Sequence, residues 1–213
     1  MVKIDLSNCK DVDGYLDKKH LSELTSLEGL NLQGTRAFAN IGVLRQNTKL
    51  KHLNLANTWI QGNLGALRNL AGLTHLNLGS CTHVSGKLTR LKWATRLKKL
   101  ILRRTNVDGD VMALENATEL THLNLADTRV VGDVSRLRPV ENLNIEGTRI
   151  TCKSQDEPLR QILLKLGLST GKLTDLKKVA GVERRMLSCR YEGFFLSSFI
   201  YIHMVWLSTS KHV

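Results

Sequence analysis

Leucines recur at fixed spacings along most of this 213-residue chain. Four segments, 50–67, 73–91, 97–114 and 120–137, begin L-x-x-L-x-L and continue through a polar turn to a glycine or a short apolar segment. Their starts are 23 or 24 residues apart. A period of this length predicts a solenoid, in which each copy buries its apolar edge only against its neighbours.

Degenerate copies extend the same frame in both directions. One starts at Leu27, another at Met1 and a last one at Val140, so about seven copies cover residues 1–152. The L-x-L alternation predicts one short strand in each copy, and stacking the copies places these strands in a parallel sheet. The expected strand centres lie near residues 30–32, 53–55, 76–78, 100–102, 123–125 and 143–145.

The second half of each copy carries a glycine and further apolar residues. Glycines at positions 62, 86, 109 and 132 indicate a tight turn or a close approach of the backbone to a neighbour. The L-x-x-L spacing that follows suits a short 3₁₀ or helical turn. The side of the solenoid opposite the strands is therefore predicted to be irregular or short-helical.

The full pattern is L-x-x-L-x-L-x-x-[T/C]-x-[V/I]-x-G-x-[L/V]-x-x-L, and it resembles the leucine-rich-repeat family. The resemblance implies an α/β solenoid of horseshoe shape, with a parallel sheet on its concave side and irregular or short-helical turns on its convex side. The ninth position departs from the family, which usually has Asn there. This chain has Thr35, Thr58, Thr105, Thr128 and Thr148 at that position, and Cys9 and Cys81 in two copies.

Threonine can replace the family's asparagine for a physical reason. A buried hydroxyl donates one hydrogen bond and accepts another, so each threonine is expected to satisfy a neighbouring carbonyl. Cys9 and Cys81 hold the same position and are expected in the core, where a thiol behaves as a small apolar group.

The chain changes character after residue 152. Residues 153–185 are predicted to form a helical C-terminal cap, because 156–168 and 172–180 have the pattern of two amphipathic helices. A separate docking element is the alternative. Residues 186–213 form a hydrophobic, aromatic tail, in which Phe194–Leu207 is a nearly unbroken apolar run.

Three interpretations of that run stay open. It is shorter than the roughly 17–25 residues that span a bilayer as a helix, so it could be a short tail anchor or an interfacial segment. It could instead pack against the cap helices. Finally, it could come from a wrongly assigned coding end, because nothing in it continues the repeat.

Charge and cysteine use indicate a cellular setting. The net charge is +12 at pH 7, the N-terminus lacks the pattern of a signal peptide, and the four cysteines are scattered. These features favour a reducing, cytoplasmic location, with membrane association through the tail as the alternative. The first copy begins at Met1 without a capping element, so we expect either a truncated start or dimerisation over it.

No pattern of catalytic chemistry occurs in the sequence. It has no Ser/His/Asp set, no phosphate-binding loop and no cysteine pair at C-x-x-C spacing, so neither a catalytic residue nor a cofactor is predicted. His52, His75 and His122 share the third position of their copies and should lie, with Lys99, on one exposed face. Their spacing is too wide for one ion and no carboxylate lies in the column, so no metal is predicted.

The strongest charge feature is a run of eight basic residues, without an acidic one, between Lys87 and Arg104. Four of them flank the inward-facing leucines of one predicted strand and should crowd the concave face. Either they form salt bridges with acidic residues of the next copy, or they bind an acidic protein surface. Nucleic acid is less favoured, because the concave positions lack stacking aromatic residues.

These features predict a non-enzymatic protein–protein interaction scaffold that binds a partner on its concave face. The alternatives are a membrane-associated, receptor-like or tail-anchored protein, and a fragment of a larger protein. The predicted partner-binding residues are Lys98, Lys99, Arg103, Arg104, His52, His75, His122, Asn54, Asn77 and Asn124.

Overall fold

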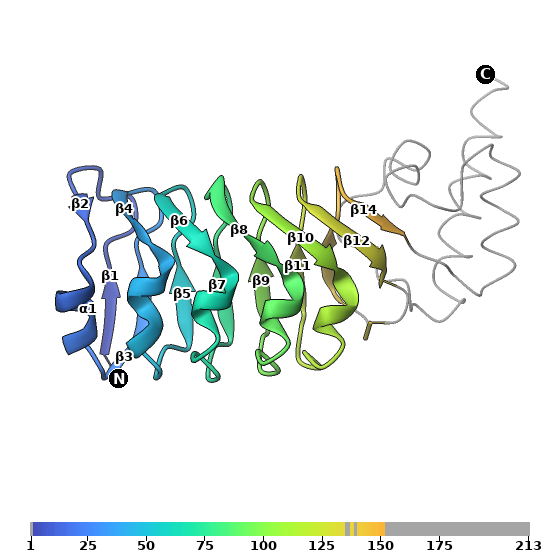
Figure 1. Ribbon diagram of the computed structural model, residues 1–213, viewed down its shortest axis with the longest axis horizontal. Helices are drawn as coiled ribbons and strands as arrows, with labels where there is room; N and C mark the ends of the chain where they lie inside the picture. The colour runs from blue at the N-terminus through green and yellow to red at the C-terminus, as the bar shows by residue number, and fades with distance from the viewer. Residues whose placement is uncertain (1, 135–136, 139, 152–213) are drawn as a thin grey trace, which may run out of the picture.

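The computed structural model describes residues 2–134, 137–138 and 140–151, and these form one continuous stack of repeats (Figure 1). The predicted cap, residues 153–185, and the aromatic tail, residues 186–213, lie outside the described residues. The predicted domain boundaries and the role of Phe194–Leu207 therefore stay predictions.

One strand from each copy joins a seven-stranded parallel sheet, here called sheet A. Its strands, in spatial order, are β1 (Val2–Asp5), β3 (Leu27–Asn31), β5 (His52–Asn54), β7 (His75–Asn77), β9 (Lys99–Ile101), β11 (His122–Asn124) and β13 (Asn142–Asn144). The predicted parallel solenoid is confirmed. From β5 onward, each strand contains the first apolar residue of the L-x-L pair and ends just before the second, as with Leu53 and Leu55.

A second parallel sheet, sheet B, contains the other strand of each copy. Its strands are β2 (Asp13–Tyr15), β4 (Arg36–Asn40), β6 (Trp59–Asn63), β8 (His83–Lys87), β10 (Asn106–Asp110), β12 (Arg129–Asp133) and β14 (Arg149–Thr151). In Figure 1 these strands and the helical turns face the viewer, with sheet A behind them. The prediction of an irregular or short-helical convex side was therefore incomplete.

The predicted helical turns are present beside sheet B. They are α1 (Lys18–Glu23), followed by the 3₁₀ helices η1 (Ile41–Gln46), η2 (Leu64–Leu67), η3 (Leu88–Leu91) and η4 (Val111–Leu114). Asn40, Asn63 and Asp110 each cap one of these 3₁₀ helices with a side-chain oxygen. These caps satisfy N–H groups that have no partner inside the helix.

The repeat glycines lie within sheet B and have the close neighbour contacts that the sequence predicted. Gly86 has a φ of +114°, and a Cβ atom there would lie 2.7 Å from Oδ1 of Asn63. A side chain at this position would therefore meet both an unfavourable backbone conformation and the cap of the preceding copy.

The core runs along the whole stack between the two sheets and the helical turns. Leu53, Leu76, Leu100 and Leu123 are successive Cα partners in sheet A, and each is at most 1% exposed. Burying a leucine side chain in this way contributes roughly 1.5–3 kcal/mol. The unbroken leucine column therefore holds neighbouring copies together.

The ninth-position residues close the turns that follow sheet A. Thr58 donates its hydroxyl proton to the carbonyl of Leu55, 2.6 Å away and three residues earlier in the same copy. The other threonines bond in the same way, to Leu32, Leu102, Leu125 and Ile145. The prediction that each threonine satisfies a neighbouring carbonyl is confirmed, and that carbonyl belongs to its own copy.

The two cysteines at this position differ. Cys81 is fully buried, and its thiol donates to the Leu55 carbonyl of the preceding copy at 2.9 Å. Cys9 is exposed, so its predicted place in the core was wrong. The reason is its position in the first copy, because β1 and β2 are the edge strands of their sheets and have a neighbour on one side only.

Candidate binding face of sheet A

The histidines predicted to share a face do lie in one row across sheet A. His52 and His75 are Cα partners, His75 pairs with Lys99, and Lys99 pairs with His122. All four side chains are partly exposed, and each is followed by a buried leucine. The predicted common face is therefore confirmed. The row continues to Gly29 and Lys3 at one end and to Asn142 at the other.

Two of these histidines have a defined tautomer. The Thr74 hydroxyl donates to the Lys51 carbonyl at 2.9 Å and lies 2.8 Å from Nδ1 of His75. Because the single hydroxyl proton is already used, Nδ1 of His75 must carry a proton and donate to the hydroxyl. Nε2 of neutral His75 then carries the free lone pair.

His122 repeats this arrangement two strands away. Thr121 donates to the Lys98 carbonyl at 3.1 Å and lies 2.8 Å from Nδ1 of His122. On the other side of the ring, Nδ2 of Asn142 lies 3.1 Å from Nε2 and donates to its lone pair. Both ring nitrogens of neutral His122 are therefore satisfied.

Burial and nearby cations favour the neutral form of the first two histidines. The pKa of His52 is lowered by burial, and further by Lys3 and Lys51. The pKa of His75 is lowered by burial and then by its neighbours His52 and Lys99. Since the ordinary histidine pKa is about 6.5, both side chains are neutral at pH 7.

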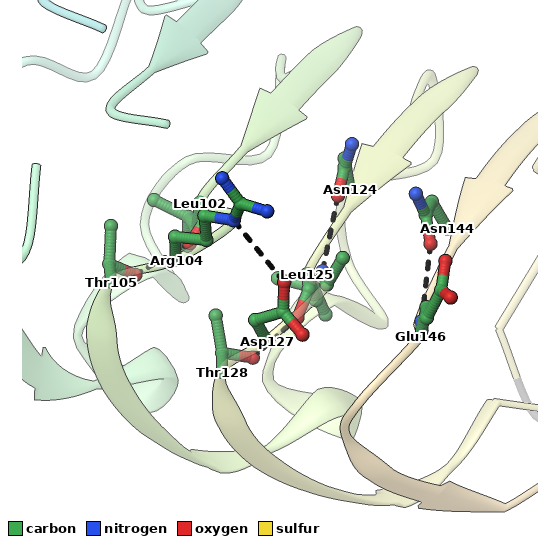
Figure 2. A network of polar contacts seen from close by, with 10 residues as sticks. Leu102, Arg104, Thr105, Asn124, Leu125, Asp127, Thr128, Asn144 and Glu146 are labelled. Atoms are coloured by element: carbon green, nitrogen blue, oxygen red, sulfur yellow. Dashed lines mark hydrogen bonds and ion pairs between the residues drawn. The ribbon is translucent and has the colours of Figure 1, made fainter. Parts of the chain in front are cut away.

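The asparagines form a second row, and their carboxamide oxygens are already in use. Oδ1 of Asn77 accepts from the backbone N–H of Gly79 at 3.0 Å, closing the turn after β7. Asn54 and Asn124 make the same bond to residues two positions ahead, and Figure 2 shows the bond of Asn124. The predicted partner-binding asparagines thus stabilise the turns, and the amino group of Asn54 also donates to Oε1 of Gln33 at 2.8 Å.

A shallow hollow of about 300 Å³ lies over the N-terminal part of sheet A. Five of the ten predicted partner-binding residues line it: His52, His75, Asn54, Asn77 and Lys99. The other five, Lys98, Arg103, Arg104, His122 and Asn124, do not line this hollow. Lys3 and Asp5 of β1 also line it and were not predicted from the sequence. Lys3 could have been found by continuing the histidine column into the first, degenerate copy.

The four basic residues around β9 divide into two pairs. Lys98 lies 3.3 Å from Glu119, and Arg104 lies 3.5 Å from Asp127, as Figure 2 shows for the second pair. These side chains are more than half exposed, so each ion pair contributes at most about 1 kcal/mol. Within the described residues, Lys99 and Arg103 have no carboxylate within 4 Å.

An exposed aromatic row on sheet B was also not predicted from the sequence. Tyr15, Phe38 and Trp59 are successive Cα partners on β2, β4 and β6 and are 59%, 47% and 65% exposed. The rings of Tyr15 and Phe38 lie 5.3 Å apart, centre to centre. The repeat pattern did not reveal this row, because Phe38 and Trp59 do not hold the same position in their copies. They become neighbours only because the pairing of β4 with β6 is offset by two residues from the repeat.

Metal binding and membrane crossing were checked over the described part of the chain. Within residues 2–134, 137–138 and 140–151, no three His, Cys, Asp or Glu side chains lie close enough together to hold a metal ion. No helix among these residues has the length and apolar character needed to cross a bilayer.

Comparison with known proteins identifies the architecture. No protein-family model matches the chain, and no curated protein sequence matches it. Among solved structures, the leucine-rich-repeat ectodomain of the Arabidopsis thaliana membrane receptor kinase GASSHO1/SCHENGEN3 matches with a TM-score of 0.59 at 20% identity. The match covers 65% of this chain and 17% of that one. The chain has the leucine-rich-repeat fold.

Two further structures share this leucine-rich-repeat fold. Internalin C2 from Listeria monocytogenes matches with a TM-score of 0.57 at 20% identity, covering 71% of this chain and 64% of that one. A plant ice-binding protein matches with a TM-score of 0.58 at 21% identity, covering 70% and 50%. The chain thus spans less than two thirds of the length of each, and at such identities the likeness concerns the fold alone.

Proposed function

We propose that this leucine-rich-repeat chain is a non-enzymatic protein-binding scaffold, and that the outer face of sheet A binds an acidic segment of a partner. One observation carries the proposal: the side chains of the hollow offer mainly hydrogen-bond donors and positive charge. The oxygens of Asn54 and Asn77 each accept a turn bond, and the amino group of Asn77 is offered, while one of the two N–H groups of Asn54 already donates to Gln33. Lys3 and Lys99 add two cations, against one lining carboxylate, Asp5.

Donors and cations complement carboxylates, and a bond between charged partners is stronger than one between neutral groups. Lys99 and Arg103 strengthen the case, because within the described residues no carboxylate compensates either of them. Nucleic acid remains less favoured at this face, since the strands of sheet A contain no Phe, Tyr or Trp on which bases could stack.

The matched structures support a protein partner in general terms. The GASSHO1/SCHENGEN3 ectodomain was solved in complex with CASPARIAN STRIP INTEGRITY FACTOR 2. The plant peptide hormone receptor RGFR1, with a TM-score of 0.57 at 21% identity over 70% of this chain and 24% of that one, was solved in complex with RGF2. The same fold therefore presents binding surfaces for partners in other proteins, and we extend that role to this chain.

The test compares two double charge reversals in the full chain. Lys99→Glu/Arg103→Glu reverses the uncompensated pair, and Lys98→Glu/Arg104→Glu reverses the pair that faces Glu119 and Asp127. Both change the net charge equally, so they weaken non-specific attraction to the same extent. The probe is a short fluorescein-labelled oligo-aspartate peptide, with oligo-lysine as the negative control, and binding is measured by fluorescence anisotropy.

We expect the first reversal to weaken binding at least about tenfold more than the second, and wild-type binding to weaken with salt because exposed charges are screened over about 8 Å. Equal losses would show that only net charge matters and would place the site elsewhere. Thermal unfolding of both variants checks that each remains folded.

Cellular location is a separate part of the proposal. We favour the cytoplasm, and the alternative is membrane association through Phe194–Leu207, outside the described residues. Carbonate extraction of cell membranes separates the two: a chain released into the supernatant supports the first, and a chain retained in the membrane pellet supports the second.

A further inference from the structure

The hollow contains a pair of contacting imidazole rings surrounded by positive charge. The ring centres of His52 and His75 lie 4.6 Å apart, with 34° between the ring planes. The charged and titratable groups that act on this pair come from every neighbouring strand and its flanks: Lys3, Asp5, Glu28, Lys51, Lys98, Lys99 and His122. Glu28 is itself 2.9 Å from the amino group of Lys51, so its charge is largely compensated.

His75 can accept a proton at one atom only. Nδ1 already carries a proton, which it donates to Thr74, so an added proton must go to Nε2. In the neutral ring this nitrogen is an acceptor and repels a carboxylate oxygen. In the protonated ring it is a charged donor, like the Asn77 amino group and the Lys99 ammonium that line the same hollow.

We propose that binding of an acidic segment in the hollow is coupled to proton uptake by the adjacent His52–His75 pair, which makes sheet A an acid-activated anion receptor. This inference rests on the proposed function and adds its regulation. In the free protein, burial and then the neighbouring cations disfavour a charge on either ring. A bound carboxylate reverses that balance, because it stabilises the imidazolium that the cations destabilise.

Linkage gives the direction of the effect. A ligand that raises the pKa of a group binds more tightly where that group is protonated, so affinity rises as pH falls. For each proton taken up on binding, the affinity increases by up to about tenfold for each unit by which the pH falls. This increase occurs between the histidine pKa in the bound protein and the lower histidine pKa in the free protein. The free-protein pKa of both histidines lies below the ordinary value, so the increase falls in the mildly acidic range.

The experiment uses the full chain and the fluorescein-labelled oligo-aspartate peptide. Aspartate side chains stay ionised above roughly pH 5.5. A difference between the affinities measured at about pH 5.5 and about pH 7.5 therefore reports protonation of the protein and not of the peptide. Calorimetry in two buffers of different ionisation enthalpy counts the protons taken up. The variants are His52→Gln, His75→Gln and the double substitution. His83→Gln is the matched control, because His83 is an exposed residue of β8 in sheet B.

We expect wild-type and His83→Gln proteins to bind at least about tenfold more tightly at the lower pH, with proton uptake. In the double variant the ratio should fall to about twofold or less, and the single variants should lie between. Wild-type binding that is independent of pH would overturn the inference and leave the proposed function standing. No binding at either pH would overturn both, and a pH dependence that survives in the folded double variant would overturn the inference by assigning the proton to another group.

Discussion

Gly86 offers a sharp test of how neighbouring copies fit together. Its φ of +114° is unfavourable for any residue with a Cβ atom, and Gly86→Ala should cost roughly 1–3 kcal/mol for that reason alone. The added methyl group would also lie 2.7–2.9 Å from three atoms of the Asn63 side chain. That side chain must then move.

Moving Asn63 has its own cost. Its Oδ1 accepts from the N–H of Gly65 at 2.8 Å and caps η2, and losing such a cap costs typically about 1 kcal/mol. We therefore expect Gly86→Ala to lower the free energy of unfolding by about 2–4 kcal/mol in all. Gly14→Ala is the matched control, because Gly14 has a similar φ of +108° and nothing within 4 Å of the added atom.

Urea denaturation, followed by circular dichroism, measures both effects. A double-mutant cycle isolates the contact: in an Asn63→Ala background, Gly86→Ala should cost only its backbone part, because the cap is already absent, giving a coupling of about 1 kcal/mol. The reasoning is refuted if the two substitutions are additive, or if Gly86→Ala costs no more than Gly14→Ala. Either result would mean that the Asn63 cap is not pressed against the next copy.

Two other predictions concern the core. Leu76→Ala removes a fully buried side chain and should cost about 2–5 kcal/mol of unfolding free energy. His75→Ala, on the outer face, should cost at most about 1 kcal/mol. Equal losses of unfolding free energy in denaturation would contradict the inward and outward sides assigned to sheet A. Burial raises the pKa of the Cys81 thiol and shields its sulfur from reagents, so Cys81 should be alkylated much more slowly than exposed Cys9. Peptide mass spectrometry after brief alkylation should find Cys9 modified and Cys81 protected until the protein is unfolded, and rapid labelling of Cys81 would argue against its place in the core.

The strands of sheet A could be predicted because the spacing of apolar residues along the chain marks where each strand lies. The L-x-L pairs, such as Leu53 and Leu55, identify both the strand and its inward face, and the fixed period places the same positions side by side. The histidine row followed from the same frame. Sheet B could not be predicted in this way, because a strand such as β10, with the sequence N-V-D-G-D, has glycine and polar residues and no apolar alternation. The strands of sheet B pair with one another because the stacking of the copies brings them side by side.

The chemical state of the candidate site was beyond the sequence for a different reason. Position in the repeat placed Asn77 on the outer face, but its availability depends on the direction of one hydrogen bond, which closes its own turn. In the same way, the tautomer of His75 depends on the hydroxyl of Thr74 already donating elsewhere. For the basic cluster, the sequence left salt bridges and partner binding as alternatives. It could not show that Lys98 and Arg104 pair with Glu119 and Asp127 while the other two basic residues stay without such a partner among the described residues.

Ile101 interrupts the asparagine row, and this affects the local stability of the copy that contains β9. Among the described residues, no side-chain oxygen accepts from the N–H of Arg103, whereas the turns after β5, β7 and β11 each have that bond. The stability of a stack is nearly a sum over copies and their interfaces, so its least supported copy limits cooperativity. Among the inner copies, the one at β9 therefore lacks a turn-closing bond worth about 1 kcal/mol, and its turn should open locally more often than the turns after β7 and β11.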